Sequence, residues 1–317
     1  MNNKTNKNNN ITVVIFTQYF RIQNVIKWSL ISFVGFILGM STLSLNIYIL
    51  PLSLFIVTAF CVGSFTFAIN NYYDVDSDRE NPRRKHINAI VSGRISKKTG
   101  ILLNTLLVII SLVICLLYKF EVFLFCAFLI FIAWSYSAPP LRLKGRPVLD
   151  VILHFFGFFA AVIWGSFIAG YVGLLNWLFA FSLGVFSTVG QVGNHIIDYS
   201  FDKASGTKTF AVWIGLEKAK TTINILTLLH LIVLIPLVLL YSLSYIITII
   251  VVIIFPIIGF LILRPKKGAF PTKRCYIYYF SIVIGGAVYL SCIIFHILFV
   301  MDIPTVDFFN LLPFLNL

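Results

Sequence analysis

Long apolar runs alternate with short polar stretches along almost the whole chain. Several are roughly 17 to 24 residues long, the length of helix that crosses a bilayer core. Nine such runs lie at residues 28–45, 49–71, 100–118, 121–137, 149–170, 173–195, 221–241, 243–263 and 276–299. No alternation typical of barrel strands is present, and an unbroken apolar run favours a helix because a helix satisfies its backbone internally. The sequence therefore predicts an all-α membrane protein, a bundle of about nine transmembrane helices.

Basic residues fall almost entirely on one side of this predicted bundle. Of the 24 Lys and Arg residues, only Lys119 lies in a loop on the other side. The positive-inside rule then places the N-terminus and the loops after the second, fourth, sixth and eighth spans in the cytoplasm, and the C-terminus outside. This topology and attraction to anionic lipid headgroups explain most of the net charge of +13, so nucleic acid is not a predicted partner.

The two ends of the chain differ in composition from its middle. The first residues, MNNKTNKNNNI, are rich in Asn and Lys, and we expect residues 1–20 to form a disordered polar tail. Residues 21–300 make up one transmembrane domain. Residues 301–317 are expected to form a short extracytoplasmic tail.

The same polar pattern, N-x-x-x-D-x-x-x-D, stands at the cytoplasmic ends of the second and sixth spans. It comprises Asn70, Asp74 and Asp78 in the first copy and Asn194, Asp198 and Asp202 in the second. Spacings of four residues place the side chains of one copy on one helix face. Four spans separate the copies, so both leave the membrane on the same side.

An Asp pair at a helix end is commonly no more than a solvated boundary. Here the chain has only eleven acidic residues, and both copies begin where the helix is still near lipid. Carboxylates at that depth are costly without a partner or a polar cavity. The pattern therefore indicates a functional site.

Four carboxylates brought together would repel one another unless a cation lay among them. A donor set of oxygen atoms alone suits Mg²⁺, which completes its coordination shell with substrate phosphates. The basic loops beside the motifs fit a phosphate-rich ligand, although many of their charges also satisfy the positive-inside rule. The sequence thus predicts a diphosphate held through two metal ions.

Two other polar residues near the membrane are ambiguous. Asp150, at the start of the fifth span, fits a helix N-cap or helix-dipole role as well as a catalytic one. His195 falls inside the second motif, but the helical period places it off the Asp face. We expect it to be a hydrogen-bonded packing residue rather than a ligand.

At these motifs the sequence resembles the UbiA superfamily of intramembrane prenyltransferases over roughly residues 20 to 300, including the count of about nine helices. That family carries N-D-x-x-D-x-x-x-D after its second helix and D-x-x-x-D after its sixth. Its Y-S-x-P-P-x-R-L-K segment is matched by Tyr136, Ser137, Pro139, Pro140, Arg142, Leu143 and Lys144. Its G-x-x-T-x-A-V-x-x-G segment is matched by Gly206, Thr209, Ala211, Val212 and Gly215.

The chain departs from the family pattern at two positions. Asn71 stands where the first motif usually has Asp, which removes one possible ligand. In the segment that corresponds to N-R-P-I-x-S-G, Asn88 replaces the Arg. Arg83, Arg84 or Lys85 could substitute for that charge. These changes concern contacts to the donor and its chain length rather than the class of protein.

The resemblance implies transfer of a polyprenyl group from a prenyl diphosphate donor to a lipophilic acceptor in the membrane, with the active site facing the cytoplasm. It assigns Mg²⁺ binding to Asp74, Asp78, Asp198 and Asp202. It assigns the diphosphate to Asn70, Arg142 and Lys144, and stabilisation of an allylic carbocation to Tyr136. The acceptor could be a quinone precursor, an ether lipid or a carotenoid. The sequence does not indicate an oligomeric state.

A membrane transporter is the main alternative. Equally spaced motifs in two halves of a chain are typical of transporters with internal repeats, although their binding sites lie near the bilayer midplane. Here the motifs lie at the cytoplasmic ends of helices. A relative that binds a prenyl lipid without catalysis is a third hypothesis, and the intact set of Asp residues disfavours it.

Overall fold

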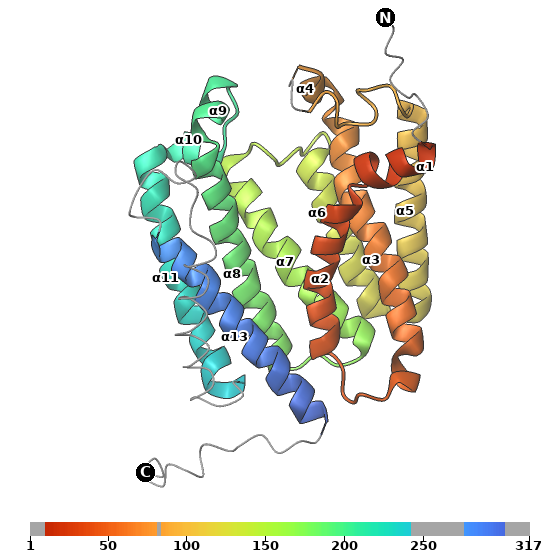
Figure 1. Cartoon of the computed structure of the whole chain (residues 1–317), viewed down its shortest axis with the longest axis vertical. Helices are drawn as coiled ribbons and strands as arrows, with labels where there is room; N and C mark the ends of the chain where they lie inside the picture. The colour runs from red at the N-terminus through yellow and green to blue at the C-terminus, as the bar shows by residue number, and fades with distance from the viewer. Residues whose placement is uncertain (1–9, 81–83, 242–275, 302–317) are drawn as a thin grey trace, which may run out of the picture. The chain divides into compact units, whose positions relative to one another are not determined.

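The computed structural model describes residues 10–80, 84–241 and 276–301, and within these ranges every regular element is a helix (Figure 1). The predicted all-α fold is confirmed for these residues. The helices are α1 (Ile11–Val14), the π-helical turn η1 (Ile15–Tyr19), α2 (Ile22–Leu38), α3 (Leu45–Tyr73), α4 (Val75–Glu80), α5 (Lys97–Tyr118), α6 (Phe120–Ser137), α7 (Pro147–Ala169), α8 (Leu174–Ile197), α9 (Tyr199–Ala204), α10 (Phe210–Ile214), α11 (Leu216–Tyr241) and α13 (Tyr276–Val300).

Six of these helices are long and apolar enough to cross a membrane, which supports a multi-pass integral membrane protein. They cover Asn46–Tyr73, Lys97–Tyr118, Phe120–Ser137, Pro147–Ala169, Leu174–Ile197 and Leu216–Leu240. Each corresponds to one predicted span. The predicted span at 276–299 corresponds to α13, of which Ile284–Val300 forms a shorter apolar helix. The predicted span at 243–263 lies outside the described residues.

The predicted first span, 28–45, was wrong in its boundaries. The helix there is α2, which begins at Ile22 and ends at Leu38 after 17 residues. Its first turns contain Gln23, Asn24 and Lys27. Polar side chains do not prevent a helix from starting, although they lower the hydropathy on which the span was based. At the other end, helix α2 stops before Gly39.

Helical structure also begins inside the segment for which a disordered tail was expected. Residues 11–19 form α1 and η1, and Asn10 caps α1 by accepting a hydrogen bond from the Thr12 backbone N–H at 3.0 Å. Val14, Tyr19 and Phe20 are buried. Burial of these apolar side chains orders a segment whose neighbouring residues are polar.

The described residues fall into two compact units. The first is drawn from Met1–Phe33 and Ile49–Leu143, and it contains α5, α6 and most of α3. The second is drawn from Val34–Tyr48 and Lys144–Leu317, and it contains α7, α8, α11 and α13. The first motif thus belongs to the first unit and the second motif to the second unit.

Small residues allow close helix packing in the second unit. Gly35 and Gly39, one turn apart on α2 and its end, face α7, where the Ser166 hydroxyl donates to the Gly35 carbonyl at 2.8 Å. A Cβ at Gly35 would clash with the Val162 carbonyl oxygen, and one at Gly39 would lie 2.5 Å from the carbonyl oxygen of Ser166. Such small-residue contacts are a common means of helix association in membranes.

Gly35→Ala is therefore expected to destabilise the protein, because the added methyl group meets backbone atoms that cannot move aside. Overpacking of this kind costs about 1–3 kcal/mol. The midpoint of thermal unfolding in detergent should fall by several degrees. Gly157→Ala is the matched control, because a Cβ at this glycine of α7 meets nothing within 4 Å. Equal midpoints for the two variants would contradict the close approach.

Candidate functional site

Both motifs span a break between a long helix and a six-residue helix. Helix α3 ends at Tyr73 and α4 begins at Val75, so Asp74 stands at the first break; Asp198 stands at the corresponding break between α8 and α9. The backbone nonetheless keeps its helical pairing, since the Asp74 N–H donates to Asn70 O at 3.0 Å and the Asp78 N–H to Asp74 O at 2.7 Å. The four-residue spacing thus survives the break.

The second motif repeats this arrangement. The Asp198 N–H donates to Asn194 O, and the Asp202 N–H donates to Asp198 O, both at 2.9 Å. Asp198 has φ −88° and ψ 4°, outside the helical range. Its side chain is exposed and that of Asp202 is half-buried. The two motifs are therefore similar in backbone structure as well as in sequence.

Around the first motif, the structure brings a carboxylate next to a predicted diphosphate-binding residue. The Arg142 guanidinium lies 3.6 Å from the Asp74 carboxylate. Arg142 has a positive φ of 36°, which is uncommon for a residue with a side chain. The loop after α6 thus places the positive charge of Arg142 beside Asp74, at the end of α3 in the first unit.

Asp78 is buried and is held by one of the two residues that depart from the family pattern. The Asn88 side-chain amide donates to Asp78 Oδ2 at 2.9 Å and to the Asn71 carbonyl at 2.8 Å. Its Oδ1 accepts from the Ile90 N–H at 3.0 Å. A neutral amide in place of Arg therefore contacts the motif directly.

Asn88→Ala is expected to cost about 1–3 kcal/mol of stability, because it leaves the buried Asp78 carboxylate and two backbone groups without this partner. The free energy should be measured by chemical denaturation in detergent. Ser77→Ala, which alters an exposed side chain of α4, is the control and should stay within about 0.5 kcal/mol of wild type. A similarly small effect at Asn88 would argue against this role.

The other departure, Asn71, ties the N-terminal segment to the first motif. Its amide donates to Gln18 O at 2.9 Å and Tyr19 O at 2.8 Å, and its Oδ1 accepts from the Arg21 guanidinium. Burial lowers the pKa of Arg21, and Arg84 adds to this effect, while the Asp78 and Asp74 carboxylates oppose it. Arg21 is therefore a positively charged side chain that is bonded to Asn71 and acts electrostatically on the carboxylates of the first motif.

Sequence reasoning missed Arg21 because it counted only as one of many positive-inside charges. Its positive φ of 54° and its contact with Asn71 distinguish it. No pattern in the sequence indicated that a residue fifty positions before Asn71 would bond to it. Of the basic residues that could substitute for the missing Arg, Arg83 lies outside the described residues.

The remaining predicted residues are half-buried. Asn70 lies near the end of α3, Tyr136 near the end of α6, and Lys144 in the loop before α7. Lys144 belongs to the second unit, whereas Asn70 and Tyr136 belong to the first. Within a unit, the structure thus brings together Asp74 with Arg142, and Asp78 with the amide of Asn88.

The loop after α9 completes the surroundings of Asp202. Gly206 has a φ of 73° and follows the end of this helix, and the Thr207 N–H donates to Asp202 O at 2.9 Å. Thr209, the N-cap of α10, is buried. Burial raises the pKa of the Asp202 carboxyl; the Thr209 side chain opposes the rise, Asp198 adds to it, and His195 opposes it.

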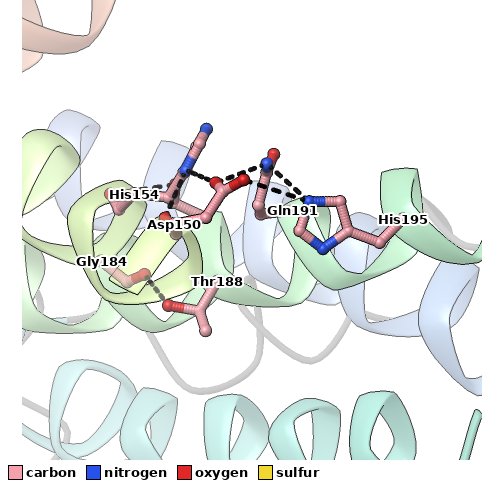
Figure 2. A network of polar contacts seen from close by, with 7 residues as sticks. Asp150, His154, Gly184, Thr188, Gln191 and His195 are labelled. Carbon is pink, nitrogen blue, oxygen red and sulfur yellow. Dashed lines mark hydrogen bonds and ion pairs between the residues drawn. The ribbon is translucent and has the colours of Figure 1, made fainter. Parts of the chain in front are cut away.

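A second polar cluster joins the C-terminal end of α8 to the first turns of α7 (Figure 2). Asp150 is buried and accepts a hydrogen bond from the Gln191 amide at 2.9 Å. His154 Nδ1 lies 3.2 Å from Asp150 Oδ1, and His195 Nε2 lies 3.4 Å from Asp150 Oδ2. The side-chain contacts of Asp150 therefore run to α8 as well as to its own helix, and the N-cap position of α7 is Arg146.

The donor set suits a hard cation when the chemistry alone is considered. Asp74 and Asp78 in the first unit, and Asp198 and Asp202 in the second, supply only oxygen atoms. Among the described residues, no group of three or more His, Cys, Asp or Glu side chains is arranged to hold a metal. Each motif supplies two carboxylates. Oxygen atoms of a substrate could occupy the remaining positions in the octahedral coordination shell of Mg²⁺.

Comparison with known proteins defines the class of the chain. Residues 29–283 match the UbiA prenyltransferase family. The chain belongs to the UbiA prenyltransferase family.

Several curated proteins are similar to the chain. It is 25% identical over 155 residues to a lycopene elongase/hydratase of Corynebacterium glutamicum, covering 48% of this chain and 54% of that protein. It is 24% identical over 208 residues to a digeranylgeranylglyceryl phosphate synthase of Sulfolobus acidocaldarius, covering 65% of this chain and 71% of that protein. The match to the lycopene elongases thus extends over only about half of their length.

Solved structures share the fold. A UbiA homologue from Archaeoglobus fulgidus, bound to GPP and Mg²⁺, superposes with a TM-score of 0.66 at 23% identity, covering 90% of this chain and 99% of that chain. A structure of digeranylgeranylglyceryl phosphate synthase gives a TM-score of 0.68 at 18% identity, covering 89% of this chain and 97% of that chain. The helical architecture is therefore that of UbiA homologues.

Proposed function

We propose that the chain is a prenyltransferase that transfers a polyprenyl group from a prenyl diphosphate to a lipophilic acceptor within the membrane. The observation that carries this proposal is the duplicated N-x-x-x-D-x-x-x-D break, at α3–α4 and α8–α9, in a member of the UbiA prenyltransferase family. Relatives named for lycopene elongation and for digeranylgeranylglyceryl phosphate synthesis support the same reaction class.

Mg²⁺ is the proposed cofactor, and Asp74, Asp78, Asp198 and Asp202 are its proposed ligands. The oxygen-only donors of both motifs support this choice, as does the Mg²⁺ bound with GPP in the Archaeoglobus fulgidus homologue. Bound Mg²⁺ would neutralise charge on the diphosphate and make it a better leaving group.

The other proposed site residues act on the donor. Arg142, beside Asp74, and Lys144 contribute positive charge to the diphosphate, and Asn70 contributes an amide at the helix end. The Tyr136 ring faces the allylic carbon and stabilises its positive charge as the bond to oxygen breaks. The surrounding apolar helices exclude water, so the acceptor rather than water attacks.

The proposed topology has about nine transmembrane helices in a domain over residues 21–300, with tails at 1–20 and 301–317. The distribution of Lys and Arg supports a cytoplasmic N-terminus and a site that faces the cytoplasm, in the cell membrane. Both motifs end helices on that same predicted side. The proposed partners are a prenyl diphosphate, a lipophilic acceptor and membrane lipid.

The acceptor is proposed only as a class. The names of the relatives favour a carotenoid or a glycerol-phosphate ether lipid over a quinone precursor. Asn71 and Asn88 surround the first motif with neutral amides, which bears on donor contacts rather than on the acceptor.

The test is an assay of purified protein with Mg²⁺, labelled geranylgeranyl diphosphate and a panel of these three acceptor classes. Formation of a prenylated product and release of diphosphate in equal amounts are expected. Metal-dependent uptake of an intact solute into proteoliposomes, without any prenylated product, would instead identify a transporter.

A further inference from the structure

A buried carboxylate on α7 contacts the turn of α8 that leads into the second motif. Asp150 is only 3% exposed, and Gln191 and His195 approach it from one face of α8, one turn apart (Figure 2). The Gln191 amide donates to Asp150 Oδ1 at 2.9 Å, and His195 Nε2 lies 3.4 Å from Asp150 Oδ2. These three residues are called the Asp150 clamp. The clamp lies entirely within the second unit.

The clamp is continuous with the second motif through one turn of backbone. The motif residue Asn194 directly precedes His195, and the Asp198 N–H donates to the Asn194 carbonyl at 2.9 Å. The next bond, from the Asp202 N–H to the Asp198 carbonyl, has the same length. A rotation or a shift of α8 at His195 therefore moves the backbone that carries both motif carboxylates.

Apolar packing alone does not specify the rotation of α8 at this end. A core cluster joins α7, α8, α10 and α11 here, and its buried members are Val151, Val189, Val192, Ile196, Ala211, Ala219 and Ile223. The hydrophobic effect that holds these side chains together is not directional. A hydrogen bond is directional, and a change of register would leave the buried polar groups of the clamp unpaired. The clamp therefore selects one register of α8 against α7, as a single buried polar residue does in a coiled coil.

We propose that Asp150 is a positioning residue for the second motif. Through the clamp, it holds the end of α8 in the register at which Asp198 and Asp202 bind the metal and the diphosphate. This inference rests on the proposed function and adds Asp150 and Gln191 to the residues on which that function depends. Carboxylates that are already held in place lose less conformational freedom when the metal-bound diphosphate arrives, so they bind it more tightly.

Gln191→Met tests the proposal, because methionine has nearly the length of glutamine but lacks the amide that donates to Asp150. Hydrogen exchange of residues 191–202 in metal-free protein, followed by mass spectrometry, should become about tenfold faster, since the backbone bonds of a released helix end open more often. Binding of inorganic pyrophosphate with Mg²⁺, measured by calorimetry well below the unfolding midpoint, should be about tenfold weaker, as expected for loss of one hydrogen bond to a charged group.

Two control variants separate positioning from a general loss of stability. His154 contacts the same carboxylate from its own helix, with Nδ1 at 3.2 Å from Asp150 Oδ1. His154→Gln should therefore keep exchange and binding within about twofold of wild type. Gly35→Ala should lower the unfolding midpoint and leave both quantities equally unchanged. Equal changes in Gly35→Ala and Gln191→Met would overturn the inference, and so would wild-type exchange or wild-type binding in Gln191→Met.

If Gln191→Met is not recovered folded, reversal of the hydrogen bond decides. Gln191→Glu places a second carboxylate against Asp150, and the two like charges repel. Adding Asp150→Asn supplies an amide that can donate to the new carboxylate. Pyrophosphate binding should be at least about tenfold weaker in Gln191→Glu and should return to within about threefold of wild type in the double variant. A double variant that binds no better than Gln191→Glu would overturn the inference.

The proposed function fails separately. It fails if wild-type protein forms no prenylated product, or if Asp198→Asn binds pyrophosphate with Mg²⁺ as wild type does. The inference about Asp150 fails while the proposed function stands if wild type and Asp198→Asn behave as expected but Gln191→Met does not differ from wild type.

Discussion

Asp74→Asn and Asp198→Asn are each expected to reduce prenyl transfer by roughly a hundred- to a thousandfold. The substitution keeps the shape of the side chain but removes the negative charge that holds a cation against the diphosphate. Loss of one preorganised group that stabilises developing charge typically costs this much in turnover. Product formation should be measured at saturating donor and Mg²⁺.

Asp76→Asn is the matched control for Asp74→Asn. Asp76 is exposed and lies on α4 between the two motif carboxylates, outside the four-residue spacing. It should keep turnover within about twofold of wild type, as a surface substitution away from special features does. Near-wild-type turnover in either motif variant, with folding verified by thermal unfolding, would show that its carboxylate has no part in the reaction.

Removal of divalent cations is expected to abolish transfer, and addition of Mg²⁺ is expected to restore it. The reason is electrostatic: without a cation, the motif carboxylates and the diphosphate carry like charges and repel each other. Protein treated with a chelator should show no product above background. Ca²⁺ should restore little activity, because it prefers longer bonds and more ligands than Mg²⁺. Full activity in excess chelator would exclude the role proposed for the metal.

Hydropathy was sufficient to predict where most helices lie, because a transmembrane helix requires a long apolar run. It failed at α2, whose N-terminal turns contain polar residues such as Gln23 and Lys27. It also missed the ordering of residues 11–19, which depends on the burial of Tyr19 and Phe20 rather than on local composition. Tertiary contacts of this kind leave no periodic pattern in the sequence.

The duplicated motif could be recognised in the sequence because residues four positions apart lie on the same face of a helix. The breaks at Asp74 and Asp198 could not, since each keeps its i to i−4 hydrogen bond. The sequence also could not predict contacts between distant segments, such as the hydrogen bonds from Arg21 to Asn71 and from Gln191 to Asp150. Gln191 and His195 lie four residues apart on one face of α8, a spacing that the sequence shows. Their shared partner, Asp150, lies on α7, so the sequence alone could not join the three residues.

The central claim is that the motif carboxylates bind a divalent metal together with the diphosphate of the donor, and electron paramagnetic resonance of Mn²⁺ in place of Mg²⁺ tests it most directly. Wild-type protein should give the signal of bound Mn²⁺, and added pyrophosphate should tighten the binding of Mn²⁺. Asp74→Asn and Asp198→Asn should each weaken this binding, whereas Asp76→Asn should not. Mn²⁺ binding that is unchanged in either motif variant, or that does not depend on pyrophosphate, would contradict the account.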